Sequence, residues 1–307
     1  MSANKQNFGV ADTALPRSID LHTHTTASDG QFTPTALIDQ AAGIGLTAIA
    51  VTDHDTVAGI AEAVVAGARV GLDVVAGIEL SAEVEKGQCH LLGYCIDPAN
   101  VPLRTRLQDV VDMRNSRNAR IVEKMRTELG FDISLTEVES EAGGDIVARP
   151  HFARVLVNKG YVTTMQEAFD IYLGKGGKAY VDRFRLSPEE AIGLVHGAGG
   201  VCILAHPNNL KLDELETEAA IKRLVGVGLD GIEARYNRHT SADNARYLSL
   251  ATRLNILTSG GSDYHGILVK QDVLLGHVEG QLPAPTILLE HIKAAAQSRR
   301  ARYFNQA

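Results

Sequence analysis

Short apolar runs alternate with amphipathic stretches of helical length in the first and last thirds of the chain. The runs are rich in β-branched residues and predict strands, while the stretches between them predict helices. Thr33 and Pro34 mark one helix start, with Thr as the N-cap and Pro at the first helical position. The predicted strands span residues 19–25, 46–53, 73–81, 89–96, 200–205, 230–235 and 255–259, and the helices around them span 34–44, 56–70, 188–198, 213–225, 241–253 and 284–297.

The alternation breaks in the middle of the chain, where we find no convincing core strand. A long charged helix is predicted over residues 101–129, followed by shorter helices near 135–142, 150–159 and 164–173. We therefore predict three parts along the chain. These are an N-terminal tail at 1–18, a discontinuous α/β domain at 19–97 and 181–300, and a helical insertion, or lid domain, at 98–180.

The separation of most strands by helices favours parallel strands joined by right-handed crossovers. One α/β barrel with a helical insertion accounts for this order, and a doubly wound open sheet is the alternative. Polar residues follow nearly every predicted strand. Since the carboxyl ends of barrel strands converge on one face, this distribution favours the barrel.

Imidazole and carboxylate side chains stand just past the apolar runs. Such groups bind divalent ions of the Zn, Mn and Fe kind. Nine of them exceed the needs of one metal site, so the sequence predicts a multinuclear metal centre and metal-assisted hydrolysis. The candidate ligands are His22, His24, Asp29, His54, Glu79, His90, His206, Asp263 and His265.

Spacing and context strengthen several of these candidates. His22 and His24 are two residues apart on a strand, which puts both on one face. Glu79 ends the run VVAGIE, where a carboxylate is costly unless paired or metal-bound. Asp53 is expected to orient an imidazole, and Asp55 to cap the following helix. Taken singly each ligand has an ordinary explanation, but nine together at the strand ends do not.

Composition narrows the class of protein. The chain has 307 residues, 45% apolar and 22% charged, as in a soluble globular protein. No window approaches 18 apolar residues, and the N-terminus lacks a signal-peptide pattern, so we expect no membrane contact and a cytoplasmic location. A net charge of −7 argues against a broad nucleic-acid binder. Three cysteines without C-x-x-C indicate a reducing compartment.

The ordered motifs H-x-H-x4-D, T-D-H-D, a strand-end Glu, then His, H-P and D-x-H resemble the polymerase-and-histidinol-phosphatase (PHP) family. The similarity is strongest to its branch of metal-dependent phosphoesterases, which includes nucleoside 3′,5′-bisphosphate phosphatases and 5′-to-3′ exonucleases. It extends over about residues 18–300. The resemblance implies a distorted seven-stranded barrel with three divalent metals, Mn being expected and Zn, Fe or Mg the alternatives.

The resemblance also implies which residues share each ion. An Asp at position 29 should favour a harder ion such as Mn or Mg. His206 and Asp263 would also count among the catalytic residues. The first ion would be held by His22, His24, Glu79 and Asp263, the second by Glu79, His90 and His206, and the third by Asp29, His54 and His265.

Substrate contacts are expected chiefly from the insertion. In the family branch an Arg equivalent to Arg149 faces the substrate phosphate, which suits the planar guanidinium, and His151 lies close to it in sequence. Arg117 lies in a series with arginines at 114 and 120 on one helix face, which predicts either a grip on a second phosphate or a solvated basic stripe. Tyr236 and Asn237 are candidates for base or ribose contacts.

The resemblance implies hydrolysis of the 3′-phosphate ester of nucleoside 3′,5′-bisphosphates, and it also suggests degradation of short 5′-phosphorylated single-stranded RNA from its 5′ end. No stable protein partner is expected. Histidinol-phosphate phosphatase is the alternative enzyme. A barrel amidohydrolase with a bridging carboxylated lysine is a further rival, but no lysine stands at a strand end and Glu79 suits the bridge. A non-catalytic metal-binding module is the rival from a different class.

Overall fold

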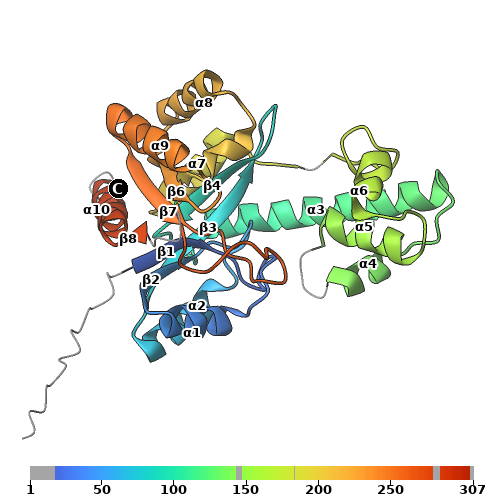
Figure 1. The fold of residues 1–307 in the computed structure, drawn as a ribbon, viewed down its shortest axis with the longest axis horizontal. Coiled ribbons are helices and arrows are strands. Elements are labelled where there is room, and N and C mark those ends of the chain that lie inside the picture. The colour runs from blue at the N-terminus through green and yellow to red at the C-terminus, as the bar shows by residue number, and fades with distance from the viewer. Residues whose placement is uncertain (1–17, 143–146, 183, 279–283, 305–307) are drawn as a thin grey trace, which may run out of the picture.

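The computed structural model describes residues 18–142, 147–182, 184–278 and 284–304, so the predicted tail, except Ser18, lies outside the described residues. One sheet organises the fold, with strand order β7-β6-β5-β4-β3-β2-β1-β8 (Figure 1). The strands are β1 (Ser18–Thr23), β2 (Leu46–Val51), β3 (Asp73–Ala82), β4 (Cys89–Tyr94), β5 (Val201–Leu204), β6 (Gly231–Tyr236), β7 (Leu257–Gly261) and β8 (Ala284–Pro285).

Helices follow most of these strands, close to the predicted positions. No described helix is both long and apolar enough to cross a membrane. The helices are α1 (Pro34–Gly43), α2 (Ile60–Val70), α3 (Val101–Thr127), α4 (Leu135–Ala142), α5 (Arg149–Asn158), α6 (Met165–Ala168), the π-helical turn η1 (Phe169–Leu173), α7 (Pro188–Gly197), the 3₁₀ turn η2 (Pro207–Leu210), α8 (Glu214–Gly226), α9 (Ser241–Leu254) and α10 (Ile287–Phe304).

The sheet curves until its first and last long strands meet. The Asp263 amide donates to the His22 carbonyl at 2.8 Å, and the His24 amide donates to the Tyr264 carbonyl at 2.9 Å. These bonds join the end of β1 to the segment that leaves β7, so the sheet forms a nearly closed barrel. The alternative of a doubly wound open sheet is wrong, because such a sheet keeps its outer strands apart.

The expectation of parallel strands is wrong for β4, which runs antiparallel to both β3 and β5. The other long neighbours pair in parallel. The cause is the short link between Ala82 and Cys89. A parallel return needs a crossover of a dozen or more residues, whereas a short link reverses the chain.

The predicted count of seven strands omits β8. The last helix was expected from residue 284, but Ala284 pairs with Ile19 and Pro285 with Ser18 in an antiparallel bridge along β1. Helix α10 begins only at Ile287. Ala284 and Pro285 therefore pair with the edge of β1 and do not form the first turn of the last helix.

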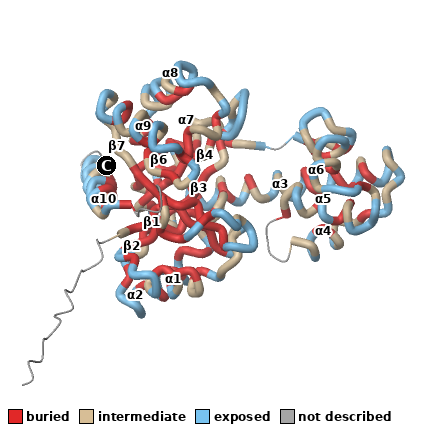
Figure 2. The backbone as a smooth tube through the Cα atoms, viewed as in Figure 1, coloured by how far each residue is buried: buried red, intermediate tan, exposed pale blue. Residues whose placement is uncertain are grey.

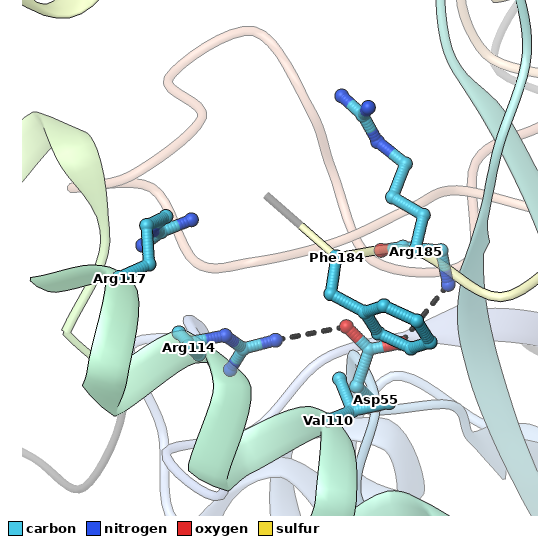
Figure 3. A pocket seen from close by; sticks show the side chains of 7 residues that line it. Asp55, Val110, Arg114, Arg117, Phe184 and Arg185 are labelled. Atoms are coloured by element: carbon cyan, nitrogen blue, oxygen red, sulfur yellow. Dashed lines mark hydrogen bonds and ion pairs between the residues drawn. The ribbon is translucent and has the colours of Figure 1, made fainter. Parts of the chain in front are cut away.

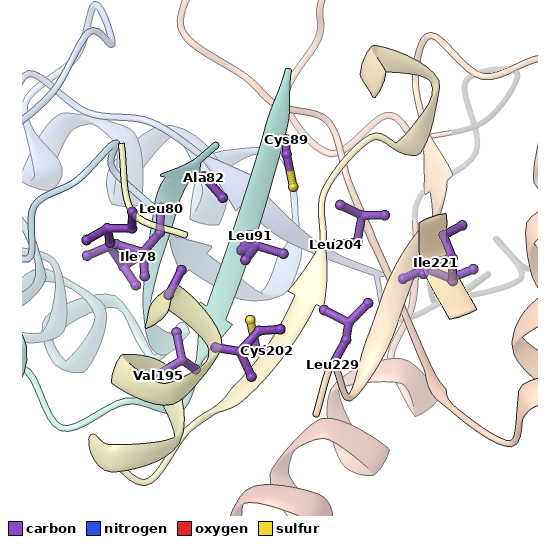
Figure 4. Packing of buried hydrophobic residues seen from close by; sticks show 14 of the residues in the cluster. Ile78, Leu80, Ala82, Cys89, Leu91, Val195, Cys202, Leu204, Ile221 and Leu229 are labelled. Carbon is purple, nitrogen blue, oxygen red and sulfur yellow. The ribbon is translucent and has the colours of Figure 1, made fainter. Parts of the chain in front are cut away.

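The outer faces of the central strands pack against helices, and this packing orients the inner faces. Ile78 and Leu80 are fully buried in a cluster that includes Val195 of α7 and Leu91 of β4 (Figure 4). Successive side chains on a strand point to opposite faces. Glu79, which stands between Ile78 and Leu80, therefore points away from this cluster and into the barrel.

Between β4 and β5 the described residues contain helices and turns but no strand. Helix α3 extends away from the barrel, and α4, α5 and α6 gather around its far half (Figure 1). Leu103 and Leu107 of its first half belong to the barrel-side core, whereas Ile121 and Met125 of its second half belong to another core together with Phe152 of α5. The buried residues accordingly form two groups in space, both reached by α3 (Figure 2).

Because the barrel closes tightly at Gly261, we expect the substitution Gly261→Ala to lower the free energy of unfolding strongly. A Cβ there would lie 2.4 Å from the His22 amide nitrogen and 2.3 Å from the His22 Cβ. Urea denaturation should show a loss of about 3 kcal/mol, because backbone must move to relieve the overlap. Gly193→Ala in α7 is the control, since its Cβ meets nothing described within 4 Å. A variant at Gly261 as stable as this control would contradict the closure.

Candidate metal centre

One buried carboxylate, that of Glu79, stands at the centre of the candidate site. Five imidazoles approach its two oxygens from four strands or the residues just beyond them. These strands are β1, β2, the reversed strand β4 and β5. The distances to Glu79 Oε2 are 3.2 Å from His22 Nε2, 3.2 Å from His24 Nε2 and 3.1 Å from His54 Nδ1, and those to Oε1 are 2.9 Å from His90 Nδ1 and 3.0 Å from His206 Nε2.

Two more carboxylates extend this cluster. Asp263 Oδ1 lies 3.4 Å from both His24 Nε2 and His265 Nδ1. Asp29 Oδ1, on a half-exposed side chain, lies 3.3 Å from His265 Nε2. All nine predicted ligands thus lie together, and we call them the ligand cluster.

The donor atoms of the ligand cluster form overlapping groups in which each atom lies within 4.8 Å of the others. The first matches the predicted set for one ion. The third predicted set gains His24. In the second set His54 stands with Glu79 and His90 in place of the predicted His206, which lies 3.0 Å from Glu79 Oε1 but belongs to none of these groups. The three groups are His22, His24, Glu79 and Asp263; His24, Asp29, His54 and His265; and His54, Glu79 and His90.

Several donor atoms at the centre are buried yet have no hydrogen-bond partner among the described residues. They include Glu79 Oε2, His22 Nε2, His54 Nδ1 and both ring nitrogens of His24. Buried polar atoms are nearly always satisfied, so such a group calls for a missing partner. Convergent imidazole nitrogens and carboxylate oxygens are the ligands of divalent transition metals, and the site therefore fits such ions.

The charge states of Glu79 and His54 suit metal binding. Burial acts to raise the pKa of Glu79, but the surrounding imidazoles, led by His54 and His22, hold this pKa well below its usual range. Burial lowers the pKa of His54 to about 3, helped by repulsion from His24 and His90. Ionised carboxylate and neutral imidazole are the forms that coordinate a metal. Burial acts to lower the pKa of His22 and of His24, but the neighbouring carboxylates raise both, so these two imidazoles must give up a proton to bind an ion.

Glu233 on β6 orients two of the imidazole-bearing residues and was missed in the sequence. Its Oε1 lies 3.0 Å from His22 Nδ1, and its Oε2 accepts the His206 amide at 2.8 Å. A ligating imidazole held through its other nitrogen by a carboxylate keeps a fixed ring orientation. The signal was available, because a Glu in the apolar run GIEA resembles the context that singled out Glu79.

Asp263 is held from its outer side by two further residues. The Tyr236 hydroxyl donates to Asp263 Oδ2 at 3.0 Å, and Lys270 Nζ lies 2.6 Å from the same oxygen. Tyr236 was singled out for base or ribose contact, but its buried hydroxyl is used here. Lys270 lies in the loop after β7, and nothing in the local sequence marks it. These contacts leave Oδ1 of Asp263 facing the imidazoles.

The roles expected for Asp53 and Asp55 are wrong. Asp53 accepts the Thr25 amide at 2.7 Å and the Ser28 hydroxyl at 2.6 Å, so it shapes the loop that carries Asp29 instead of orienting an imidazole. Asp55 accepts the Ser81 amide at 3.0 Å, and α2 begins only at Ile60. The intervening turn moves the helix start beyond the reach of Asp55.

Two residues of the ligand cluster have a left-handed backbone conformation, which non-glycine residues rarely adopt. The φ angles are 26° at His206 and 58° at Asp263. Such conformations are costly and persist only where surrounding structure enforces them. The Glu233 bond to the His206 amide and the barrel-closing bond from the Asp263 amide supply that enforcement.

The predicted substrate residues of α5 lie at its N-terminus. Arg149 donates to the Val181 carbonyl at 2.7 Å, and its guanidinium carbon lies 4.6 Å from the centre of the Tyr180 ring. His151 accepts the Ala148 amide through Nδ1. Burial and Arg154 lower the pKa of His151, and attraction to Asp29 is among the opposing effects. The start of α5 is therefore within electrostatic range of the ligand cluster.

The arginines of α3 do not form a solvated stripe. Arg114 pairs with Asp55 at 2.8 Å, and Arg117 is buried with a guanidinium nitrogen 2.7 Å from Asn118 Oδ1. Of the three arginines in the predicted stripe, at 114, 117 and 120, only Arg120 is exposed. Asn237, the remaining candidate, has a buried side-chain oxygen without a partner among the described residues.

A family model described as PHP domain matches residues 20–180. The Chromobacterium violaceum 3′,5′-nucleoside bisphosphate phosphatase is 34% identical over 251 residues, which cover 81% of this chain and 87% of that protein. The Escherichia coli 5′-3′ exoribonuclease Rnm is 32% identical over 258 residues, covering 83% of this chain and 88% of that protein. The chain belongs to the PHP domain family.

A solved structure agrees with this assignment. A Bifidobacterium adolescentis protein described as a metal-dependent phosphoesterase superposes with a TM-score of 0.74 at 32% identity. The match covers 90% of this chain and 95% of that chain. Most of the fold therefore has a counterpart in a related protein.

From its position we expect Glu233 to orient the imidazole of His22 for metal binding. Glu233→Gln removes the charge that orients His22, and metal affinity should fall about 10- to 100-fold, as for other residues that orient a ligand. Isothermal titration with Mn²⁺ measures this change. Glu83→Gln, at an exposed position beyond β3, is the matched control. Equal affinities of the two variants would exclude the orienting role.

Proposed function

We propose that this protein is a metal-dependent phosphoesterase that hydrolyses the 3′-phosphate ester of nucleoside 3′,5′-bisphosphates. The chief observation is the buried Glu79 carboxylate within reach of five imidazoles, with buried donor atoms that have no hydrogen-bond partner in the described part of the chain. The substrate class follows from 34% identity to a protein named as a 3′,5′-nucleoside bisphosphate phosphatase. The product would be a nucleoside 5′-monophosphate and inorganic phosphate.

Short 5′-phosphorylated RNA is the second proposed substrate, on the basis of 32% identity to a protein named as a 5′-3′ exoribonuclease. The chemistry is the same in both cases. Water adds to the phosphorus, and the bond to the 3′ oxygen of the first nucleoside breaks. A site that requires a 5′ phosphate would then accept either a mononucleotide or an RNA end.

We assign the ligand cluster to three divalent ions, with Mn²⁺ as the expected metal. Bound divalent ions would lower the pKa of water and neutralise charge on the phosphoryl oxygens. The protein's part is to hold the donors in place. Glu79 lies between the groups, Glu233 orients His22, and Lys270 with Tyr236 fixes the carboxylate of Asp263.

Residues 98–180 are proposed to form a lid domain beside the barrel domain, which comprises 19–97 and 181–300. Support comes from the separate core around Phe152 and from the reach of α3 into both cores. Arg149, at the first turn of α5, is the proposed clamp on the reacting phosphate, since a guanidinium presents paired donors to phosphate oxygens. His151, two residues further in the same turn, is a second proposed contact.

Phosphate release tests the proposed reaction directly. Protein reconstituted with Mn²⁺ should convert 3′-phosphoadenosine 5′-phosphate to AMP, and EDTA should abolish this activity until Mn²⁺ is restored. Histidinol phosphate and a short 5′-phosphorylated RNA serve as parallel substrates. Turnover of histidinol phosphate alone would favour the alternative phosphatase, and full activity of rigorously metal-free protein would exclude the metal mechanism.

Arg149→Ala should lower kcat/KM for the bisphosphate by about tenfold or more, because removing a charged hydrogen bond costs roughly 1.5–3 kcal/mol. Steady-state kinetics measures the change. Arg154→Ala is the control, since Arg154 lies on the same helix but is exposed and pairs with Glu141 at 3.2 Å. Unchanged kinetics at Arg149 would remove this residue from the site.

A further inference from the structure

A second pocket lies beside the ligand cluster, between α3 and the segment that returns from the helical region to the barrel (Figure 3). We call it the arginine pocket. Its lining is mostly polar and contains three guanidinium groups and one aromatic ring. The residues that matter to its chemistry are Asp55, Ser81, Arg114, Arg117, Phe184 and Arg185.

The arginine pocket shares two strand ends with the ligand cluster. Asp55 directly follows His54, and Ser81 stands two residues after Glu79 on β3. Residues two apart on a strand face the same side and lie roughly 7 Å apart along it. Ser81 in the arginine pocket therefore lies roughly 7 Å along β3 from Glu79 in the ligand cluster, a span similar to that of one ribose.

The charge of the arginine pocket favours an anion. Its one carboxylate, on Asp55, already accepts Arg114 at 2.8 Å and the Ser81 amide at 3.0 Å. Among the described residues no carboxylate pairs with Arg185. Figure 3 shows the Arg185 side chain extending away from Asp55. Since Asp55 is already paired with Arg114, the charge of Arg185 makes the arginine pocket positive, and guanidinium matches phosphate geometry.

Phe184 adds a surface for a base. Its side chain remains 39% exposed beside the Arg114–Asp55 pair (Figure 3). The guanidinium carbon of Arg106 lies 4.8 Å from the ring centre, so one cation already uses the ring. An exposed aromatic ring next to free positive charge is the combination by which proteins hold nucleotides without reading their sequence.

We propose that the arginine pocket binds the 5′-phosphorylated nucleoside end of the substrate, with Arg185 on the 5′ phosphate and Phe184 against the base. The 3′ ester then lies over the ligand cluster. This inference rests on the proposed function and adds the residues that select for a 5′ phosphate. It places them on the segment after the helical region, apart from Arg149 on α5.

The test compares ligands that differ only in the 5′ phosphate. Isothermal titration of metal-free protein with AMP and with adenosine should show that Arg185→Ala weakens AMP binding about tenfold or more and leaves adenosine binding unchanged. Arg185→Lys should restore part of the affinity. Phe184→Ala should weaken both ligands, and Phe184→Tyr should restore both.

Kinetics supplies a second readout that does not depend on AMP affinity. Wild type should prefer 3′-phosphoadenosine 5′-phosphate over 3′-AMP by at least about tenfold in kcat/KM, and Arg185→Ala should remove this preference. A 5′-phosphorylated dinucleotide, compared with its 5′-hydroxyl form, extends the comparison to an RNA end. Arg104→Ala, at an exposed position on α3, controls for loss of surface charge.

The outcomes separate the two proposals. Unchanged AMP binding in Arg185→Ala, or an equal loss for 3′-AMP and the bisphosphate, overturns the arginine pocket as the 5′-phosphate site. Wild-type protein that binds AMP through Arg185 but hydrolyses no bisphosphate refutes the proposed function and leaves the pocket standing. Thermal unfolding and Mn²⁺ titration of each variant exclude misfolding as the cause.

Discussion

The buried carboxylate of Glu79 is the constraint on which the rest of the structure depends. An ionised carboxylate deep in a protein is stable only with compensating charge and hydrogen bonds, and an uncompensated one costs several kcal/mol. Five imidazoles and the implied cations provide that compensation. The imidazoles come from β1, β2, β4 and β5 or the residues just beyond them. The single carboxylate of Glu79 therefore contacts side chains from four strands of the barrel.

The irregular parts of the barrel serve this convergence. The reversal of β4 puts His90 at the same end of the sheet as Glu79, although its strand runs the opposite way. The close approach of Gly261 to His22 brings Asp263 across the closure. The positive φ angles at His206 and Asp263 are unfavourable in free energy. They turn these two side chains from the strand ends toward the other ligand-cluster residues.

The helical region acts on the same strand ends from outside the barrel. Arg114 of α3 pairs with Asp55, the residue after His54, so the long helix is coupled directly to the rim of the ligand cluster. The segment that returns to β5 brings Phe184 and Arg185 to the same place. Residues that recognise the non-reacting end of a substrate and residues that act on its reacting end can thus lie on different segments of the chain. Both sets are close to the same strand ends of the barrel.

The sequence by itself determined the α/β class, nearly all element positions and the nine ligand-cluster residues. These depend on local signals, namely apolar periodicity and a charged or imidazole side chain placed after a buried run. Only the tertiary structure decided the direction of β4, the pairing of β8, the contacts of Glu233 and Lys270, and the place of Arg185 in the arginine pocket. The reason is sequence separation: Glu233 lies 211 residues from His22, and such a pair is set by how the barrel closes, not by neighbouring residues.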